Sequence, residues 1–127
     1  MKNIKILLVD DEPAYLKSLS LALRGLKKYG FEPEIFQADN LEGALGVLDL
    51  NKIDLVITDG QFFEKKQGYP LKFLGNKLAF EAGRKLIPII GMSAAPKSFQ
   101  PELFDVIFKK PVEIMELIKK IIKLEER

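Results

Sequence analysis

Short apolar segments alternate along the chain with longer segments whose apolar residues recur at helical spacing. The short segments are rich in β-branched residues and end abruptly at polar or turn residues. This pattern is typical of strands buried on both faces of a parallel sheet. We expect such strands at residues 4–9, 34–38, 54–59, 87–92 and 106–108.

The longer segments predict helices. We expect the first helix at residues 13–29, where Pro13 suits the first helical position and Gly30 follows the end. A second helix contains Leu41 and Leu48 on one face and is capped by Asp39 or Asn40. Two further helices are expected at residues 70–82 and 112–124.

Strands that alternate with helices along one short chain predict a doubly wound α/β domain with a five-stranded parallel sheet. The 127 residues suit one domain, residues 1–127, and contain no repeat, linker or low-complexity tract. Residues 94–102 hold two prolines and little periodicity, so we expect the fourth helix to be short or absent.

The composition is that of a soluble globular protein, with 47% hydrophobic and 30% charged residues. No apolar stretch is long enough to span a membrane, and Asp10 and Asp11 interrupt the first apolar run before it resembles a signal peptide. The net charge of +2 is too small to indicate nucleic acid. We therefore expect a cytoplasmic protein without a nucleic-acid or membrane partner.

Cysteine and histidine are both absent from the chain. Their absence excludes disulfides, thiolate or histidine metal ligands, and Ser-His-Asp or Cys-His catalysis within this chain. A general base or a metal ligand must then be a carboxylate or a backbone carbonyl.

Side chains that can do chemistry follow four of the five predicted strands. Asp10 and Asp11 follow the first strand, Asp59 ends the third, Ser93 follows the fourth, and Lys110 lies just after the fifth. In the common doubly wound order 2-1-3-4-5, the first and third strands are neighbours, and ligands bind at the carboxyl ends of such strands. The three acids would then converge at one edge of the sheet.

Three carboxylates in close contact cannot all stay ionised unless a cation offsets their repulsion; otherwise at least one pKa rises. Oxygen ligands favour a hard ion, and Mg2+ suits two or three carboxylates with a carbonyl. Ser93 and Lys110 would add a hydroxyl donor and a positive charge. A phosphoryl group held by such groups has the surroundings that phosphoryl transfer requires.

Four short motifs occur in order along the chain: L-L-V-D-D-E-P, D-L-V-I-T-D, G-M-S-A and F-K-K-P. Together they resemble the motifs of a response-regulator receiver domain of two-component signalling, a flavodoxin-like fold of the chemotaxis-receiver type. The resemblance covers the whole chain and implies the strand order 2-1-3-4-5.

The resemblance implies a role for each pocket residue. Asp59 would accept a phosphoryl group from a phosphohistidine of a sensor histidine kinase or phosphotransfer protein. Mg2+ would be bound by Asp11, by Asp10 mainly through water, by Asp59 and by the backbone carbonyl of Gln61. Ser93 would bind a phosphoryl oxygen and swing inward.

The remaining implications concern the lysine and the output. Lys110 would pair with the phosphate, and its bond to Pro111 would be cis. The chain would be a signalling domain that turns over no separate substrate, so it would not be an enzyme, and its output would be an unknown partner protein.

Two segments depart from the usual receiver pattern. Phe62 and Phe63 stand where receivers carry Met-Pro, and residues 60–68 hold extra length. One hypothesis is that Phe62, Phe63 and Tyr69 form a loop that partly covers the pocket and slows water attack; the alternative is that they pack beneath the loop as satellite core. The segment from Ser93 to Lys110 is shorter than usual, which puts the usual output surface in question.

Other interpretations remain open. Asp10 and Asp11 could merely cap a helix, Asp59 could be a turn residue, and Ser93 and Lys110 could be ordinary surface residues. The main alternative function is a receiver-like interaction module that works without phosphorylation. An aspartate-nucleophile phosphatase would need Asp-x-Asp after the first strand, and a flavin domain would need Ser, Thr or Gly donors there.

The predicted last helix carries a broad apolar stripe. Its members share one side of the helix, and Met115 and Ile122 widen it. We consider a deeply buried helix first and a homodimer or partner surface second.

Overall fold

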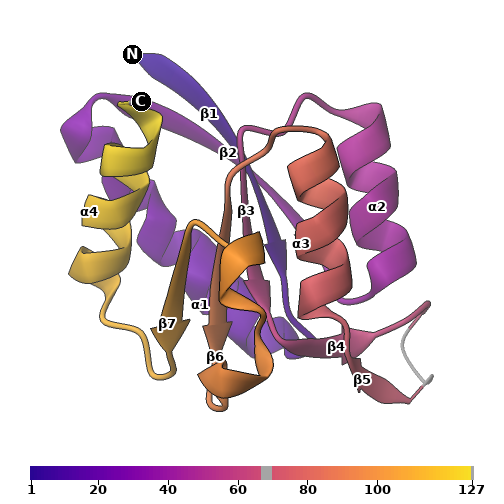
Figure 1. Cartoon of the computed structure of the whole chain (residues 1–127). Coiled ribbons are helices and arrows are strands. Elements are labelled where there is room, and N and C mark those ends of the chain that lie inside the picture. Colours follow the sequence, from indigo (N-terminus) through magenta and orange to yellow (C-terminus); the bar gives the residue numbers. More distant parts are fainter. Residues whose placement is uncertain (67–69, 127) are drawn as a thin grey trace.

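The computed structural model describes residues 1–66 and 70–126. Its centre is a five-stranded parallel sheet in the order β2-β1-β3-β6-β7 (Figure 1). Counting only these five strands, the order is 2-1-3-4-5, so the predicted α/β fold is confirmed. The strands are β1 (Lys2–Val9), β2 (Phe31–Ala38), β3 (Leu55–Asp59), β6 (Ile89–Ser93) and β7 (Val106–Lys109).

Helices cover both faces of this sheet. On one side lie α1 (Pro13–Leu23) and α4 (Ile114–Glu125), and on the other lie α2 (Leu41–Leu50) and α3 (Gly75–Arg84) (Figure 1). A hydrophobic core lies on each face of the sheet, and alternate residues of β1 pack into one or the other. Leu8 packs in the core with α1 and α4, whereas Leu7 packs in the core with α2 and α3. Both residues are fully buried, as the continuous apolar run of a central parallel strand requires.

The helix ends show which local signals are used. Asn40, not Asp39, caps α2, and its side-chain oxygen accepts a hydrogen bond from the Gly43 amide at 2.6 Å. The first helix is shorter than predicted, because α1 ends at Leu23 and continues as a 3-10 helix, η1 (Arg24–Tyr29). Gly30 ends this helix with a φ of 89°, a left-handed conformation that glycine adopts readily.

The segment after β3 differs most from the sequence prediction. The helix expected at residues 70–82 begins only at Gly75, because the preceding residues form β5 (Leu71–Phe73), which pairs antiparallel with β4 (Gln61–Phe63). Leu71 fits the helical spacing but is 47% exposed, whereas Leu78 is fully buried. Spacing alone therefore extended the predicted helix too far. Below, "the hairpin" means β4 and β5.

The fourth helix of the usual pattern is indeed missing, as predicted. Residues 94–105 contain only two three-residue 3-10 helices, η2 (Pro96–Ser98) and η3 (Pro101–Leu103). Aromatic rings from this segment replace helix packing. The Phe99 and Phe104 rings lie 4.6 Å apart, and both approach Gly91 in β6, where a Cβ atom would come within about 3.1 Å of each ring.

The apolar stripe of α4 is mostly buried. Leu117, Ile118 and Ile121 are buried in the core beneath α1 and α4, and Ile122 packs against that core. Met115 is 39% exposed. The stripe therefore serves the core, as the first interpretation has it, and a homodimer through this helix stays a prediction. No helix in the described part of the chain is long and apolar enough to cross a membrane.

Candidate functional site

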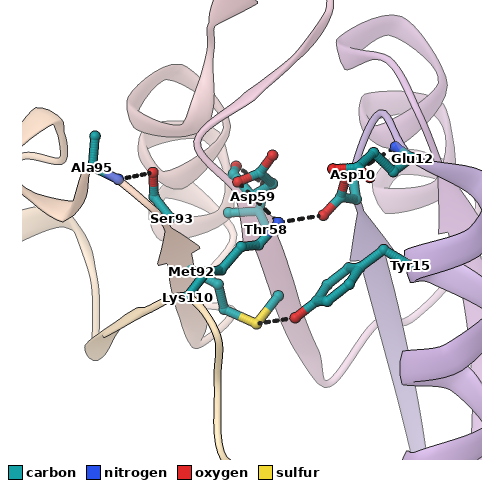
Figure 2. A network of polar contacts seen from close by, with 9 residues as sticks. All are labelled: Asp10, Glu12, Tyr15, Thr58, Asp59, Met92, Ser93, Ala95 and Lys110. Atoms are coloured by element: carbon teal, nitrogen blue, oxygen red, sulfur yellow. Dashed lines mark hydrogen bonds and ion pairs between the residues drawn. The ribbon is translucent and has the colours of Figure 1, made fainter.

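The predicted site residues lie together at the carboxyl ends of the parallel strands. The strand register aligns Val9 with Thr58 and Asp59 with Met92, so the residues that end these neighbouring strands face one space (Figure 2). A pocket of about 310 Å³ opens there. It is lined by Asp11, Glu12, Asp59, Gln61, Phe73, Ser93, Ala94, Ala95, Ser98 and Lys110.

Lys110 connects the two buried acids. Its Nζ atom lies 2.9 Å from Oδ2 of Asp10 and 3.4 Å from Oδ1 of Asp59, and it sits 4.3 Å from the centre of the Tyr15 ring. Burial alone would lower the pKa of Lys110, but the hydrogen bond and charge of Asp10, with the charge of Asp59, raise it overall. The lysine is therefore held in its charged form. The Lys110–Pro111 bond is cis, as predicted.

Asp59 lies in surroundings that raise its pKa, and the single lysine beside it does not fully offset this rise. Burial raises the pKa of its carboxyl, the charge of Asp10 raises it further, and Lys110 only partly counteracts both. The pKa of Asp11 is also raised, first by burial and then by the charge of Asp10. The pocket therefore has an unbalanced negative charge, which a bound cation would relieve.

The oxygen atoms in this pocket fit a hard divalent cation. Among the described residues, Asp10, Asp11 and Glu12 can bring one carboxylate oxygen each within 4.8 Å of one another. Glu12 is not among the ligands that the sequence predicts, whereas Asp59, which is predicted, does not belong to this group of three. Carboxylate oxygens are ligands that Mg2+ prefers. This donor set supports the predicted cofactor.

The backbone carbonyl of Gln61 is also compatible with a ligand role. Gln61 lies opposite Phe73 in the hairpin, and the Leu74 amide donates to the Gly60 carbonyl at 3.0 Å. This pattern makes Gln61 and Phe73 a non-hydrogen-bonded pair, whose own N–H and C=O groups point away from the partner strand. The Gln61 carbonyl is therefore not used by β5.

The helix-cap interpretation of the first two acids is wrong. The residue that caps α1 is Glu12, and it makes no side-chain capping bond. Asp10 instead turns the chain by accepting a hydrogen bond from the Glu12 amide at 3.0 Å, and it is only 1% exposed. A buried carboxylate with a lysine partner suits a binding pocket better than a helix terminus.

Ser93 lies on the opposite side of Asp59 from Asp10 (Figure 2). Its Oγ atom accepts a hydrogen bond from the Ala95 amide at 3.0 Å, and the residue is 7% exposed. The structure thus brings Asp11, Asp59, Gln61, Ser93 and Lys110 to one pocket, and Asp10 lies buried behind it in contact with Lys110. Their individual roles stay predictions.

Phe62 and Phe63 do not cover the pocket as the loop hypothesis predicts. Phe62 is fully buried, as the alternative expects, but it packs in the main core beneath α2 and α3 and not in a satellite core. Phe63 does not line the pocket described above, and Tyr69 lies outside the described residues. Phe73 lines the pocket instead.

Sequence reasoning also missed Tyr15. Its ring faces Lys110, and its hydroxyl donates to the Met92 sulfur at 3.8 Å (Figure 2). The available signal was its position two residues after Pro13, in the helical turn that follows the acidic pair. Burial raises the pKa of Tyr15, while the charge of Lys110 opposes that rise. Its hydroxyl therefore stays neutral beside the lysine.

No protein-family model matches the sequence, and no curated protein matches it. Solved structures do match. A protein of Chloroflexus aurantiacus assigned as a response regulator is 24% identical, with a TM-score of 0.78, and the match covers 99% of this chain and 100% of the other. A receiver domain from Clostridium thermocellum is 22% identical, with a TM-score of 0.73 and coverage of 98% and 95%.

A third match is the response regulator TrrA of Thermotoga maritima, solved in complex with Mg2+ and BeF. It is 29% identical, with a TM-score of 0.69, and the match covers 98% of this chain and 99% of TrrA. Several further matches are receiver domains that align with nearly the whole chain. This chain therefore folds as a single receiver-like domain built on a five-stranded parallel sheet.

Proposed function

We propose that this chain is a phosphoacceptor receiver of a cytoplasmic two-component phosphorelay, phosphorylated on Asp59 by a sensor histidine kinase or phosphotransfer protein. One observation carries the proposal: on a receiver fold, Lys110 contacts both Asp10 at 2.9 Å and Asp59 at 3.4 Å in one pocket. A lysine that reaches the acceptor carboxylate is placed to meet the phosphoryl group that forms there.

In the transfer, a carboxylate oxygen of Asp59 bonds to phosphorus while the donor's phosphorus–nitrogen bond breaks. The electron pair of that bond stays on the donor imidazole, which leaves neutral when its other nitrogen carries a proton. Lys110 then offsets charge on the phosphoryl oxygens. Mg2+, held by Asp11, Asp10, Asp59 and the Gln61 carbonyl, would neutralise the remaining negative charge.

Ser93 gives the pocket a way to respond. Its Oγ atom now accepts from the Ala95 amide at 3.0 Å. If Ser93 turns to donate to a phosphoryl oxygen on Asp59, the bond to Ala95 is lost, and the start of the 94–105 segment loses one of its attachments. We propose that a partner protein senses this change and that the chain turns over no separate substrate.

The matched structures support the proposal to different extents. TrrA was solved with Mg2+ and BeF, and it is the match with the highest identity among those compared above. We extend Mg2+ binding to this chain on the strength of its own carboxylates. The kinase and the output partner follow from the class of domain and are proposed only as classes.

Phosphorylation can be tested without a known kinase. The protein is incubated with Mg2+ and acetyl phosphate, and its intact mass is measured. We expect the wild type to gain the mass of one phosphoryl group, and Asp59→Asn to gain none. A wild type that gains no phosphoryl group under these conditions would favour the phosphorylation-independent interaction module.

A further inference from the structure

Phe73 lies beside the acceptor in a way that no other aromatic residue does in the described part of the chain. It is the one aromatic side chain there that lines the pocket with Asp59, Ser93 and Lys110. It comes from the hairpin, not from the strands that carry the chemistry. Its contribution to the site therefore needs a separate explanation.

The ring of Phe73 is set against the residue that follows the acceptor. A Cβ atom at Gly60 would collide with the ring, because it would lie 2.8 Å from the Cζ atom of Phe73. Only a residue without a side chain lets the ring lie this close to the backbone next to Asp59. Gly60 and Phe73 thus form a matched pair.

The ring also packs against Phe99. The two rings meet edge to face with their centres 5.3 Å apart, and Phe99 is only 3% exposed. The backbone next to Phe73 is fixed as well, because the amides of Leu74 and Gly75 both donate to the Gly60 carbonyl at 3.0 Å. The ring is therefore a fixed wall of the pocket and not a free surface side chain.

We propose that Phe73 shields the phosphorylated Asp59 from water and so lengthens the lifetime of the signal. This inference rests on the proposed function. In hydrolysis, a water oxygen bonds to phosphorus, the bond from phosphorus to the Asp59 oxygen breaks, and the electron pair returns to the carboxylate. Both protons of the water end on the released inorganic phosphate.

An aromatic wall opposes this reaction in two ways. The ring offers no acceptor that could orient a water or take its proton, and it occupies volume that water would otherwise fill. Ala94 and Ala95 continue the apolar lining on the Ser93 side. Removal of the ring should therefore speed hydrolysis more than it changes phosphoryl uptake from a reactive donor.

The test measures the loss of phosphoryl group after loading. Wild type, Phe73→Ala, Phe73→Leu and Phe80→Ala are loaded with acetyl phosphate and Mg2+, freed of donor, and followed by intact mass. Phe80 is a matched control, because it is a phenylalanine outside the pocket and 55% exposed on α3. Circular dichroism shows that each variant is folded.

We expect the loss rate of Phe73→Ala to rise at least about fivefold, Phe73→Leu to fall between it and the wild type, and Phe80→Ala to match the wild type. Equal rates in folded Phe73→Ala and wild type would overturn the inference. If Phe73→Ala does not fold, a Phe73→Leu rate equal to wild type would do the same. If the wild type never takes up a phosphoryl group, the proposed function fails and this inference fails with it.

Discussion

The pocket and its surroundings are built by different means. At the ends of β1, β3 and β7, charged groups meet directly, as in the 2.9 Å contact between Lys110 and Asp10. In the hairpin and the 94–105 segment, rings pack on glycines, as Phe73 does on Gly60 and Phe104 does on Gly91. The register of the parallel strands positions the chemistry, and aromatic packing shapes the access to it.

This comparison predicts that the two regions can be changed separately. Side-chain variants of the hairpin or the 94–105 segment should alter stability and access while the cation site persists, because Gln61 would contribute only its backbone carbonyl. Variants of the acids should alter cation binding and pH dependence while the hairpin stays folded. Four measurements would break or sharpen this separation.

The largest expected effect is a loss of stability when Phe62, the hairpin residue that packs in the core, is replaced. Phe62→Ala removes a fully buried ring and should lower the free energy of unfolding by about 3–5 kcal/mol, as measured by urea denaturation. The exposed control Phe80→Ala should stay within about 0.5 kcal/mol of wild type. A cost below about 1 kcal/mol for Phe62→Ala would mean that the hairpin is not anchored in the core.

Among the side chains, only the acids of the pocket should determine cation binding. Mg2+ at about 100 times its dissociation constant should add about 2.7 kcal/mol to the stability of the wild type, read as a rise in melting temperature that chelator reverses. Asp11→Asn should lose most of that rise, and the exposed hairpin control Lys72→Ala should keep it. An equal rise in the melting temperature of Asp11→Asn would show that Asp11 does not bind the cation.

Asp59 should destabilise the protein at neutral pH when no divalent cation is present. Its pKa in the folded state is raised above the ordinary 3.8, chiefly by burial and then by Asp10. The cost is therefore fully present above the folded-state pKa and absent below about pH 3.8. We expect Asp59→Asn to melt a few degrees higher than wild type at pH 7 in chelator.

The advantage of Asp59→Asn should shrink as the pH falls through the folded-state pKa of Asp59. Melting curves of both proteins across this range would show it. An Asp59→Asn protein that melts below the wild type at pH 7 would mean that the contact with Lys110 outweighs burial and the repulsion by Asp10.

The smallest expected effect concerns the attachment of the 94–105 segment to α3. The Asn76 side chain donates to the Ser98 carbonyl at 3.0 Å and accepts from the Gln100 amide at 2.8 Å. Asn76→Ala should cost about 1 kcal/mol and speed hydrogen exchange of the Gln100 amide. The neighbouring exposed control Lys77→Ala should change neither the stability nor the exchange rate. Unchanged exchange in Asn76→Ala would show that these two hydrogen bonds do not hold the segment on α3.

The difference between the strand-end pocket and the aromatic segments around it also explains which features could be predicted from the sequence. Asp10, Asp59 and Ser93 each lie at the end of a short apolar strand, and parallel strands bring such ends together. With the strand order that the receiver resemblance implies, this pattern was enough to predict the pocket. The absent fourth helix was also predictable from the prolines at positions 96 and 101. Both signals lie within a few residues of the feature that they predict.

The hairpin carried no comparable local signal. Leu71, Leu74 and Leu78 have helical spacing, yet Leu71 is exposed in a strand and the helix starts at Gly75. The place of Phe73 depends on Gly60, which lies 13 residues earlier, and on Phe99, which lies 26 residues later. Contacts of this kind follow from tertiary packing and not from periodicity.

The central claim is that Asp59 is the phosphoacceptor. After loading with acetyl phosphate and Mg2+, borohydride reduces the acyl phosphate and marks the acceptor aspartate, which peptide mass spectrometry then locates. We predict that the mark falls on Asp59. A mark on Asp10, Asp11 or another residue, or no mark on a protein that remains folded, would contradict the account.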